Sequence, residues 1–115
     1  MNKTTGGVTA AKGFKASGVR CGIKQKGPDL AAIYSEVECS VAAVFTTNAF
    51  KAASVVVNQQ KLPAGKARAI IVNSGNANAC TGEKGLADVH AICKLAAGLL
   101  SIPEEQVFNA STGII

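Results

Sequence analysis

One segment, residues 69–100, constrains the fold of this 115-residue chain more than any other. It begins with a continuously apolar run at 69–72, which predicts a strand buried on both faces. A polar, glycine-containing segment follows at 73–82, and an amphipathic helix is predicted from about 85 to 100. Its apolar residues recur at steps of three and four: Leu86, Val89, Cys93, Ala96 and Leu100. A buried strand that leads into such a helix is typical of an α/β fold.

Several other segments are predicted to be strands. Runs rich in Ala, Val and Ile predict strands at 29–35, 40–46 and 53–58, with the polar segment 36–38 connecting the first two, and a short strand at 107–108. The first 28 residues are rich in Gly, Lys and Ser, which predicts loop with one or two short strands. Pro103 ends the helix.

The predicted elements do not close a complete fold. Four or five largely two-sided strands need cover on both faces, and one helix covers only part of one face. The last two residues, Ile114 and Ile115, are also apolar. We therefore expect residues 1–115 to form a single partial domain that packs against another sheet or another chain.

Composition excludes several classes of protein. Hydrophobic residues make up 48% of the chain and charged residues 17%, which excludes an intrinsically disordered protein. A membrane-spanning helix and a signal peptide are not predicted, since there is no run of 18 apolar residues and residues 1–7 contain no apolar core. We expect a cytoplasmic protein with reduced, mostly buried thiols and no metal, because closely spaced ligand pairs are absent. The four cysteines are Cys21, Cys39, Cys80 and Cys93, and the single histidine, His90, falls at the edge of the helix stripe, where a boundary role is the commoner one.

The net charge of +5 has three interpretations. Basic residues gather before Asp29 and again between Glu38 and Glu83. They predict a solvated basic face, a nucleic-acid surface, or a field that attracts small anionic substrates. Only one aromatic residue, Phe14, lies in the first basic block, so a nucleic-acid surface is the weaker of the first two. Charge alone does not choose among the three.

The motifs for nucleotide binding and for a serine nucleophile are absent, and two polar strand ends remain as candidate sites. In 73–82, the side chains of Asn73, Asn76 and Asn78 are candidates for a substrate pocket, and the alternative is a tight strand-to-helix connection. In 110–113, the Thr112 hydroxyl and the Gly113 amide form a compact pair of donors. Such a pair can hold an oxyanion in acyl transfer, each donor contributing about 3 kcal/mol. The alternative is an ordinary turn.

The whole chain resembles one enzyme family. The segments that carry the resemblance are GFKASG (13–18), GIK (22–24), DLA (29–31), VFTTN (44–48), RAIIVNSGNANACTG (68–82) and ASTGII (110–115). They are similar, in order and at natural spacing, to the start of the bifunctional ornithine acetyltransferase/N-acetylglutamate synthase of arginine biosynthesis. The segment 73–82 is highly specific for this family.

The resemblance implies a fold, a reaction and a set of partners. The fold is the layered α/β sandwich of the DmpA-like, N-terminal-nucleophile type, of which this chain is part. The precursor cleaves itself before a threonine into an α chain and a β chain, expected to assemble as two of each. The new N-terminal threonine is the nucleophile that moves acetyl from N2-acetylornithine to glutamate in a ping-pong cycle. No metal or bound cofactor is needed, and some members also accept acetyl-CoA.

The same resemblance assigns Thr112 (hydroxyl) and Gly113 (amide) to the oxyanion hole. The nucleophile and the other substrate-binding residues of the family lie beyond Ile115, so the chain alone is expected to be inactive. A shortened chain, an additional cleavage product and part of a split assembly all remain open. Two alternative functions also remain, a basic α/β binding module without catalysis and a related self-processing amidohydrolase.

Overall fold

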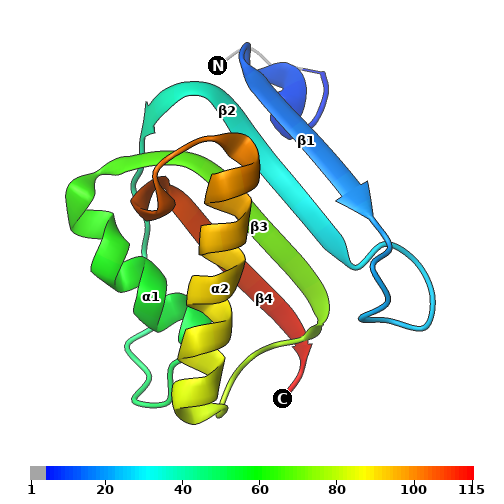
Figure 1. Ribbon diagram of the computed structural model, residues 1–115, viewed down its shortest axis with the longest axis vertical. Helices are drawn as coiled ribbons and strands as arrows, with labels where there is room; N and C mark the ends of the chain where they lie inside the picture. Colours follow the sequence, from blue (N-terminus) through cyan, green and yellow to red (C-terminus); the bar gives the residue numbers. More distant parts are fainter. Residues whose placement is uncertain (1–4) are drawn as a thin grey trace.

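The computed structural model describes residues 5–115 as one mixed sheet with two α-helices (Figure 1). The strands are β1 (Phe14–Val19), β2 (Leu30–Ser40), β3 (Lys66–Asn76) and β4 (Val107–Ile114). The helices are α1 (Ala53–Lys61) and α2 (Gly82–Leu100), with short 3₁₀ helices at η1 (Val8–Ala10), η2 (Leu62–Ala64) and η3 (Glu104–Gln106). No helix in this described part is long and apolar enough to cross a membrane.

The sheet has the order β1-β2-β3-β4. The pairs β1–β2 and β2–β3 are antiparallel, whereas β3 and β4 are parallel, with α2 as the crossover between them. Both α-helices lie on the same face of the sheet (Figure 1). The parallel pair brings the C-terminal ends of β3 and β4 to one edge, and it is this edge that the candidate site occupies.

The core fills the layer between the two helices and the sheet. Val57 of α1, Val89 and Cys93 of α2, and Val107 of β4 are each at most 1% exposed. Because successive side chains of a strand point to opposite faces, Ile71 of β3 faces this layer and its neighbour Ile70 faces away. Ile70 is 38% exposed, on the sheet face opposite α1 and α2.

The prediction of a strand at 53–58 is wrong, because these residues form helix α1. The β-branched run at 55–57 costs only a fraction of a kcal/mol per residue in a helix. Helical spacing buries Val57 and turns Ser54 and Asn58 toward β4, where both make hydrogen bonds. Lys61 Nζ then donates to the carbonyls of Glu104 and Val107, at 3.1 and 2.8 Å. These tertiary contacts outweigh the β propensity.

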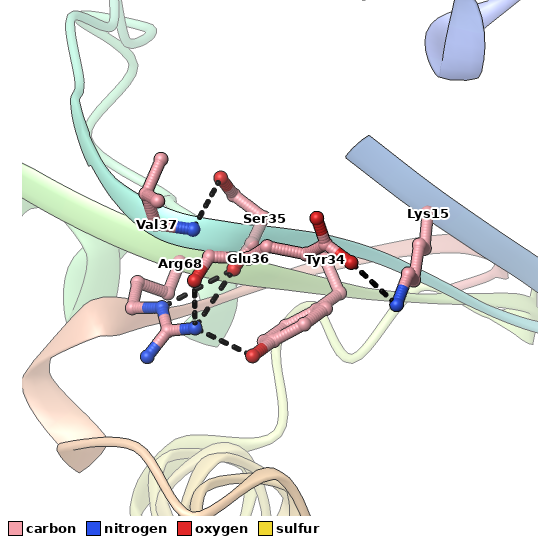
Figure 2. A network of polar contacts seen from close by, with 6 residues as sticks. All are labelled: Lys15, Tyr34, Ser35, Glu36, Val37 and Arg68. Atoms are coloured by element: carbon pink, nitrogen blue, oxygen red, sulfur yellow. Dashed lines mark hydrogen bonds and ion pairs between the residues drawn. The ribbon is translucent and has the colours of Figure 1, made fainter. Parts of the chain in front are cut away.

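The predictions that 36–38 connects two separate strands and that 40–46 is a strand are also wrong. Strand β2 runs through 36–38 with a register shift between Tyr34 and Cys39. Arg68 makes this irregularity tolerable, since its guanidinium donates to the carbonyls of Ser35 and Glu36 and to the Tyr34 hydroxyl (Figure 2). Residues 41–48 have no regular secondary structure.

The remaining elements agree with the sequence, and the α/β fold class is confirmed. The predicted strands at 69–72 and 107–108 lie inside β3 and β4, the predicted helix lies inside α2, and β1 is the short strand expected in the first 28 residues. The expectation of mostly buried thiols is wrong: Cys93 is buried, whereas Cys21 and Cys80 are exposed in loops.

Candidate active site

The structure brings the two predicted polar segments together at one edge of the sheet. In the parallel register, Ser74 is opposite Thr112 and Gly75 is opposite Gly113. The amide of Ala77 donates to the carbonyl of Ile114 at 3.0 Å, so the two strand ends stay joined past the last pair. Helices α1 and α2 both begin at this edge (Figure 1). Strand ends of this kind are where open α/β folds commonly hold ligands.

Thr112 and Gly113 are both exposed at this edge. The side chains of Asn109 and Ser111 reach Ser54 on the helix side of β4. Because side chains alternate along a strand, the Thr112 side chain points to the opposite face. Gly113 has a φ of +134°, and a Cβ atom there would lie 2.4 Å from the carbonyl carbon of Gly75. Glycine is therefore required at 113 by both backbone conformation and packing.

A short loop, residues 20–24, lies against one side of the site, and the Asp29 side chain holds its backbone in place. Its carboxylate accepts hydrogen bonds from the amides of Cys21, Gly22 and Lys24, at 2.6, 3.1 and 2.8 Å. The amides of Cys21 and Lys24 hold the pKa of the Asp29 carboxyl well below its usual 3.8. The carbonyl of Asp29 accepts from the Ser74 amide at 2.9 Å, which ties the loop to the end of β3.

The loop also packs directly against Gly75. A Cβ atom on Gly75 would lie 2.8 Å from Ile23 Cγ2 and 2.8 Å from Lys24 Cγ. Gly75 thus lies between two neighbours: loop 20–24 packs against it on one side, and Gly113 of β4 packs against its backbone on the other. The aliphatic part of Lys24 lies at the strand end, and its half-buried side chain places a positive charge near the site.

The side chains of Asn73, Asn76 and Asn78 are engaged within the chain. Asn73 Nδ2 donates to the carbonyl of Asn76 at 2.8 Å, and Asn76 Oδ1 accepts from the amide of Asn78 at 2.9 Å. Asn78 Nδ2 donates to the Gly85 carbonyl, and its Oδ1 accepts from the Thr81 hydroxyl at 2.6 Å. These contacts correspond to the tight strand-to-helix connection, in which Asn78 has a φ of +50°.

Sequence reasoning missed a set of polar residues beneath the site. Ser54 and Asn58 of α1 meet Asn109 and Ser111 of β4 on the helix side of the sheet. Ser54 and Asn109 are 5% and 1% exposed. The spacing of Ser54 and Asn58, four residues apart, is the signal that could have shown them on one helix face, but only once 53–58 is taken as a helix.

His90 lies away from this edge. Its Nδ1 is 3.6 Å from Glu104 Oε1, beside η3 and the start of β4, and both side chains are partly exposed. Within the described residues, no group of three His, Cys, Asp or Glu side chains is arranged to hold a metal ion.

Comparison with known proteins decides the family. Residues 15–115 match the ArgJ family. The chain belongs to the ArgJ family. The arginine biosynthesis bifunctional protein ArgJ of Caldanaerobacter subterraneus subsp. tengcongensis is 53% identical over 115 residues, which are 100% of this chain and 28% of that protein. Its counterpart from Shouchella clausii is 46% identical over 112 residues, 96% of this chain and 28% of that protein.

Two solved ArgJ-family structures share the fold. The crystal structure of ArgJ from Bacillus halodurans has a TM-score of 0.93 and 49% identity, and the match covers 96% of this chain and 58% of that one. Ornithine acetyltransferase from Mycobacterium tuberculosis, solved with ornithine bound, has a TM-score of 0.90 and 46% identity over 95% of this chain and 60% of its own. The chain spans about 28% of the length of the curated ArgJ relatives and is one part of their layered α/β domain.

Proposed function

We propose that this chain is part of an acetyltransferase that moves acetyl from N2-acetylornithine to glutamate, and that it supplies the oxyanion hole. The observation that carries the proposal is the position of the Thr112 hydroxyl and the Gly113 amide. Both lie exposed at the joined ends of β3 and β4, on a backbone held by the glycine contact. Membership of the ArgJ family and the ornithine bound by the mycobacterial relative support the same reaction.

The proposed chemistry divides between two chains. The hydroxyl of the N-terminal threonine of a β chain attacks the acetyl carbonyl of N2-acetylornithine, and the α-amine of that threonine takes the hydroxyl proton. The carbonyl oxygen becomes negatively charged, and Thr112 and Gly113 donate hydrogen bonds to it. Collapse of this intermediate breaks the bond between carbon and nitrogen and releases ornithine, whose nitrogen receives the proton. Glutamate then attacks the acetyl-threonine by the same route in reverse.

The partners follow from this division of roles. The nucleophile belongs to the β chain, so isolated residues 1–115 are expected to catalyse no acetyl transfer. We propose a heterotetramer of two α and two β chains in the cytoplasm, with no metal or bound cofactor and with acetyl-CoA as a second donor in bifunctional members.

The charge of the chain agrees with its proposed substrates. Glutamate has a net negative charge at pH 7, whereas the carboxylate of N2-acetylornithine is balanced by its side-chain ammonium group. The net charge of +5 therefore provides a field that attracts glutamate. Arg20, Lys24 and Lys26 lie in or beside the loop that closes the site. Of the three interpretations of the basic residues, attraction of small anions is the one that this arrangement favours.

Substitution of Thr112 by alanine in the complete enzyme tests the proposal. We expect kcat to fall about 10²- to 10³-fold while the thermal unfolding midpoint is unchanged, because one oxyanion donor is lost from an exposed position. Lys84→Ala is a suitable control, since it removes only an exposed ion pair with Asp88 on α2. A wild-type kcat in Thr112→Ala would exclude the oxyanion role.

A further inference from the structure

The polar residues beneath the site form a continuous chain of hydrogen bonds that ends next to Thr112. We infer that Ser111 and Asn73, the last pair of this chain, are positioning residues that hold Thr112 and Gly113 in the geometry required by the oxyanion. This inference rests on the proposed function. It concerns side chains that point away from the substrate and act through the backbone of β4.

The pair itself joins the two parallel strands. Ser111 and Asn73 are opposite each other in the register of β3 and β4. Ser111 Oγ donates to Asn73 Oδ1 at 2.6 Å, and Asn73 Nδ2 donates onward to the carbonyl of Asn76 at 2.8 Å. The side-chain bond therefore reinforces the backbone pairing one residue before Thr112.

A second, deeper group of hydrogen bonds anchors β4 to the helix layer. Ser54 Oγ donates to Asn109 Oδ1 at 2.6 Å, and Asn109 Nδ2 donates to the Ile71 carbonyl at 3.3 Å. Asn58 pairs with the backbone of Asn109, its Nδ2 donating to the carbonyl at 2.8 Å and its Oδ1 accepting from the amide at 3.2 Å. The hydroxyls of Ser54 and Ser111 are 3.2 Å apart, which joins the two groups.

This arrangement fixes a position more strictly than apolar packing would. Apolar contacts are non-directional, whereas each of these donors has a specific acceptor, and a shift of β4 along β3 would leave buried polar groups unpaired. Ser54 and Asn109 are almost fully buried, so water does not readily replace a lost partner. The start of β4, at Val107, is instead packed in the apolar core.

The position of β4 matters because oxyanion stabilisation is sensitive to distance. Donors must lie about 2.7–3.1 Å from the developing charge, and a small displacement of the backbone moves the Thr112 hydroxyl and the Gly113 amide together. Ser111 faces the helices and Thr112 faces the opposite side of the sheet. The hydrogen bond between Ser111 and Asn73 therefore fixes the position of β4 from the side that the proposed substrate does not occupy.

The test is a comparison of Ser111→Ala with Ser111→Thr in the complete enzyme. We expect Ser111→Ala to lower kcat about 10-fold and to leave KM for N2-acetylornithine within twofold, because transition-state stabilisation is lost and substrate binding is kept. Ser111→Thr retains the hydroxyl and is expected to restore kcat to within about threefold of wild type. Equal kcat values for the Ala and Thr variants would overturn the inference.

A double-mutant cycle with Thr112→Ala separates positioning from general stability. If Ser111 acts through Thr112, Ser111→Ala costs about threefold or less in the Thr112→Ala background, against about 10-fold in wild type. Losses that multiply would overturn the inference. A large loss in Thr112→Ala with wild-type kcat in Ser111→Ala overturns the positioning role alone, whereas wild-type kcat in Thr112→Ala overturns the proposed function.

Val89→Ala provides the control for folding. Val89 is fully buried in the core between α2 and the sheet, so its truncation is expected to lower the unfolding midpoint at least as much as Ser111→Ala. Assayed well below both midpoints, Val89→Ala should keep kcat within twofold of wild type. A loss in Val89→Ala equal to that in Ser111→Ala would overturn the inference, because destabilisation alone would then explain both.

Discussion

Gly113 and Gly75 lie in backbone contact across the parallel strands β4 and β3. A Cβ atom on Gly113 would come within 2.4 Å of the Gly75 carbonyl carbon and 2.6 Å of the Asn76 amide nitrogen. Neither atom belongs to a flexible side chain, so the strands themselves would have to separate. The contact thus makes the geometry of the proposed oxyanion hole a property of two strands rather than of one turn.

Gly113→Ala is therefore expected to destabilise the protein by about 3 kcal/mol or more, through overpacking and backbone strain. Thermal or denaturant unfolding measures the change. Gly18→Ala is the matched control, because Gly18 lies in β1 with nothing within 4 Å of its Cβ position. The control is expected to be close to neutral, and similar midpoints for the two variants would contradict the packing argument.

Two glycines of helix α2 predict opposite effects of the same substitution. A Cβ atom on Gly98 meets nothing within 4 Å, so Gly98→Ala is expected to stabilise the helix by about 0.5–1 kcal/mol. A Cβ atom on Gly85 would lie 1.9 Å from Thr81 Oγ1 and 2.4 Å from Asn78 Oδ1, so Gly85→Ala breaks the hydrogen-bonded loop. Midpoints from thermal unfolding should move in opposite directions, and a rise for both would disprove the role of the loop.

The lowered pKa of the Asp29 carboxyl leads us to expect that the stability of the folded protein depends on pH. Its folded-state pKa is below the usual 3.8, so its contribution to stability is present in full above the unfolded pKa. That contribution decreases as the pH falls below about 4 toward the folded-state pKa. Asp29→Asn lacks the charge and turns an amide group toward backbone donors, so it is expected to be less stable than wild type at pH 7.

Denaturant midpoints measured at several pH values test this prediction. The wild-type midpoint should fall more steeply than that of Asp29→Asn below pH 4, because only the wild type loses the ionised carboxylate. The difference between the two proteins should therefore shrink with acid. Parallel curves over this range would mean that the three amide hydrogen bonds contribute nothing that depends on ionisation.

Arg68 and Lys15 are expected to differ in their contributions to stability, because Arg68 is half-buried and the ion pair of Lys15 is exposed. Its guanidinium donates to two carbonyls of the irregular part of β2 and lies 5.1 Å from the centre of the Tyr34 ring. Arg68→Ala is expected to lower stability by about 1–3 kcal/mol, since these carbonyls lose a charged donor. Lys15→Ala removes only the exposed ion pair with Glu36 beside it (Figure 2), and no measurable change in midpoint is expected. Equal losses would contradict this reading.

Local sequence patterns were sufficient for some elements and insufficient for others. The stripe of α2 and the apolar run at 69–72 predicted a helix and a strand, because their partners lie on one predictable face. The run at 55–57 is β-branched, yet it is helical because Ser54, Asn58 and Lys61 reach partners on β4 and η3 that lie 43 to 55 residues later. No local window contains those partners.

The two polar segments of the candidate site could be identified from the sequence, but their contacts could not. The polar ends after two strands placed 73–82 and 110–113 at a sheet edge, and the family resemblance assigned roles to Thr112 and Gly113. The hydrogen bonds that occupy Asn73, Asn76 and Asn78 depend on loop geometry and could not be deduced from composition. The hydrogen bond between Ser54 and Asn109 beneath the site requires α1 to lie against β4. It could not be predicted while 53–58 was taken to be a strand.

Because β4 pairs with β3 in a fixed parallel register, the site depends on whether an even or an odd number of residues is deleted before Asn109. Deleting one residue between η3 and Asn109 would turn every later side chain of β4 to the opposite face of the sheet. Thr112 would then point into the helix layer and Ser111 out to solvent. Deleting two would restore each side chain to its face but move it two positions along β3. Deleting an odd number of residues in this connection would thus remove the Thr112 hydroxyl from the proposed oxyanion hole and put the Ser111 hydroxyl on that face, although both residues remain in the sequence.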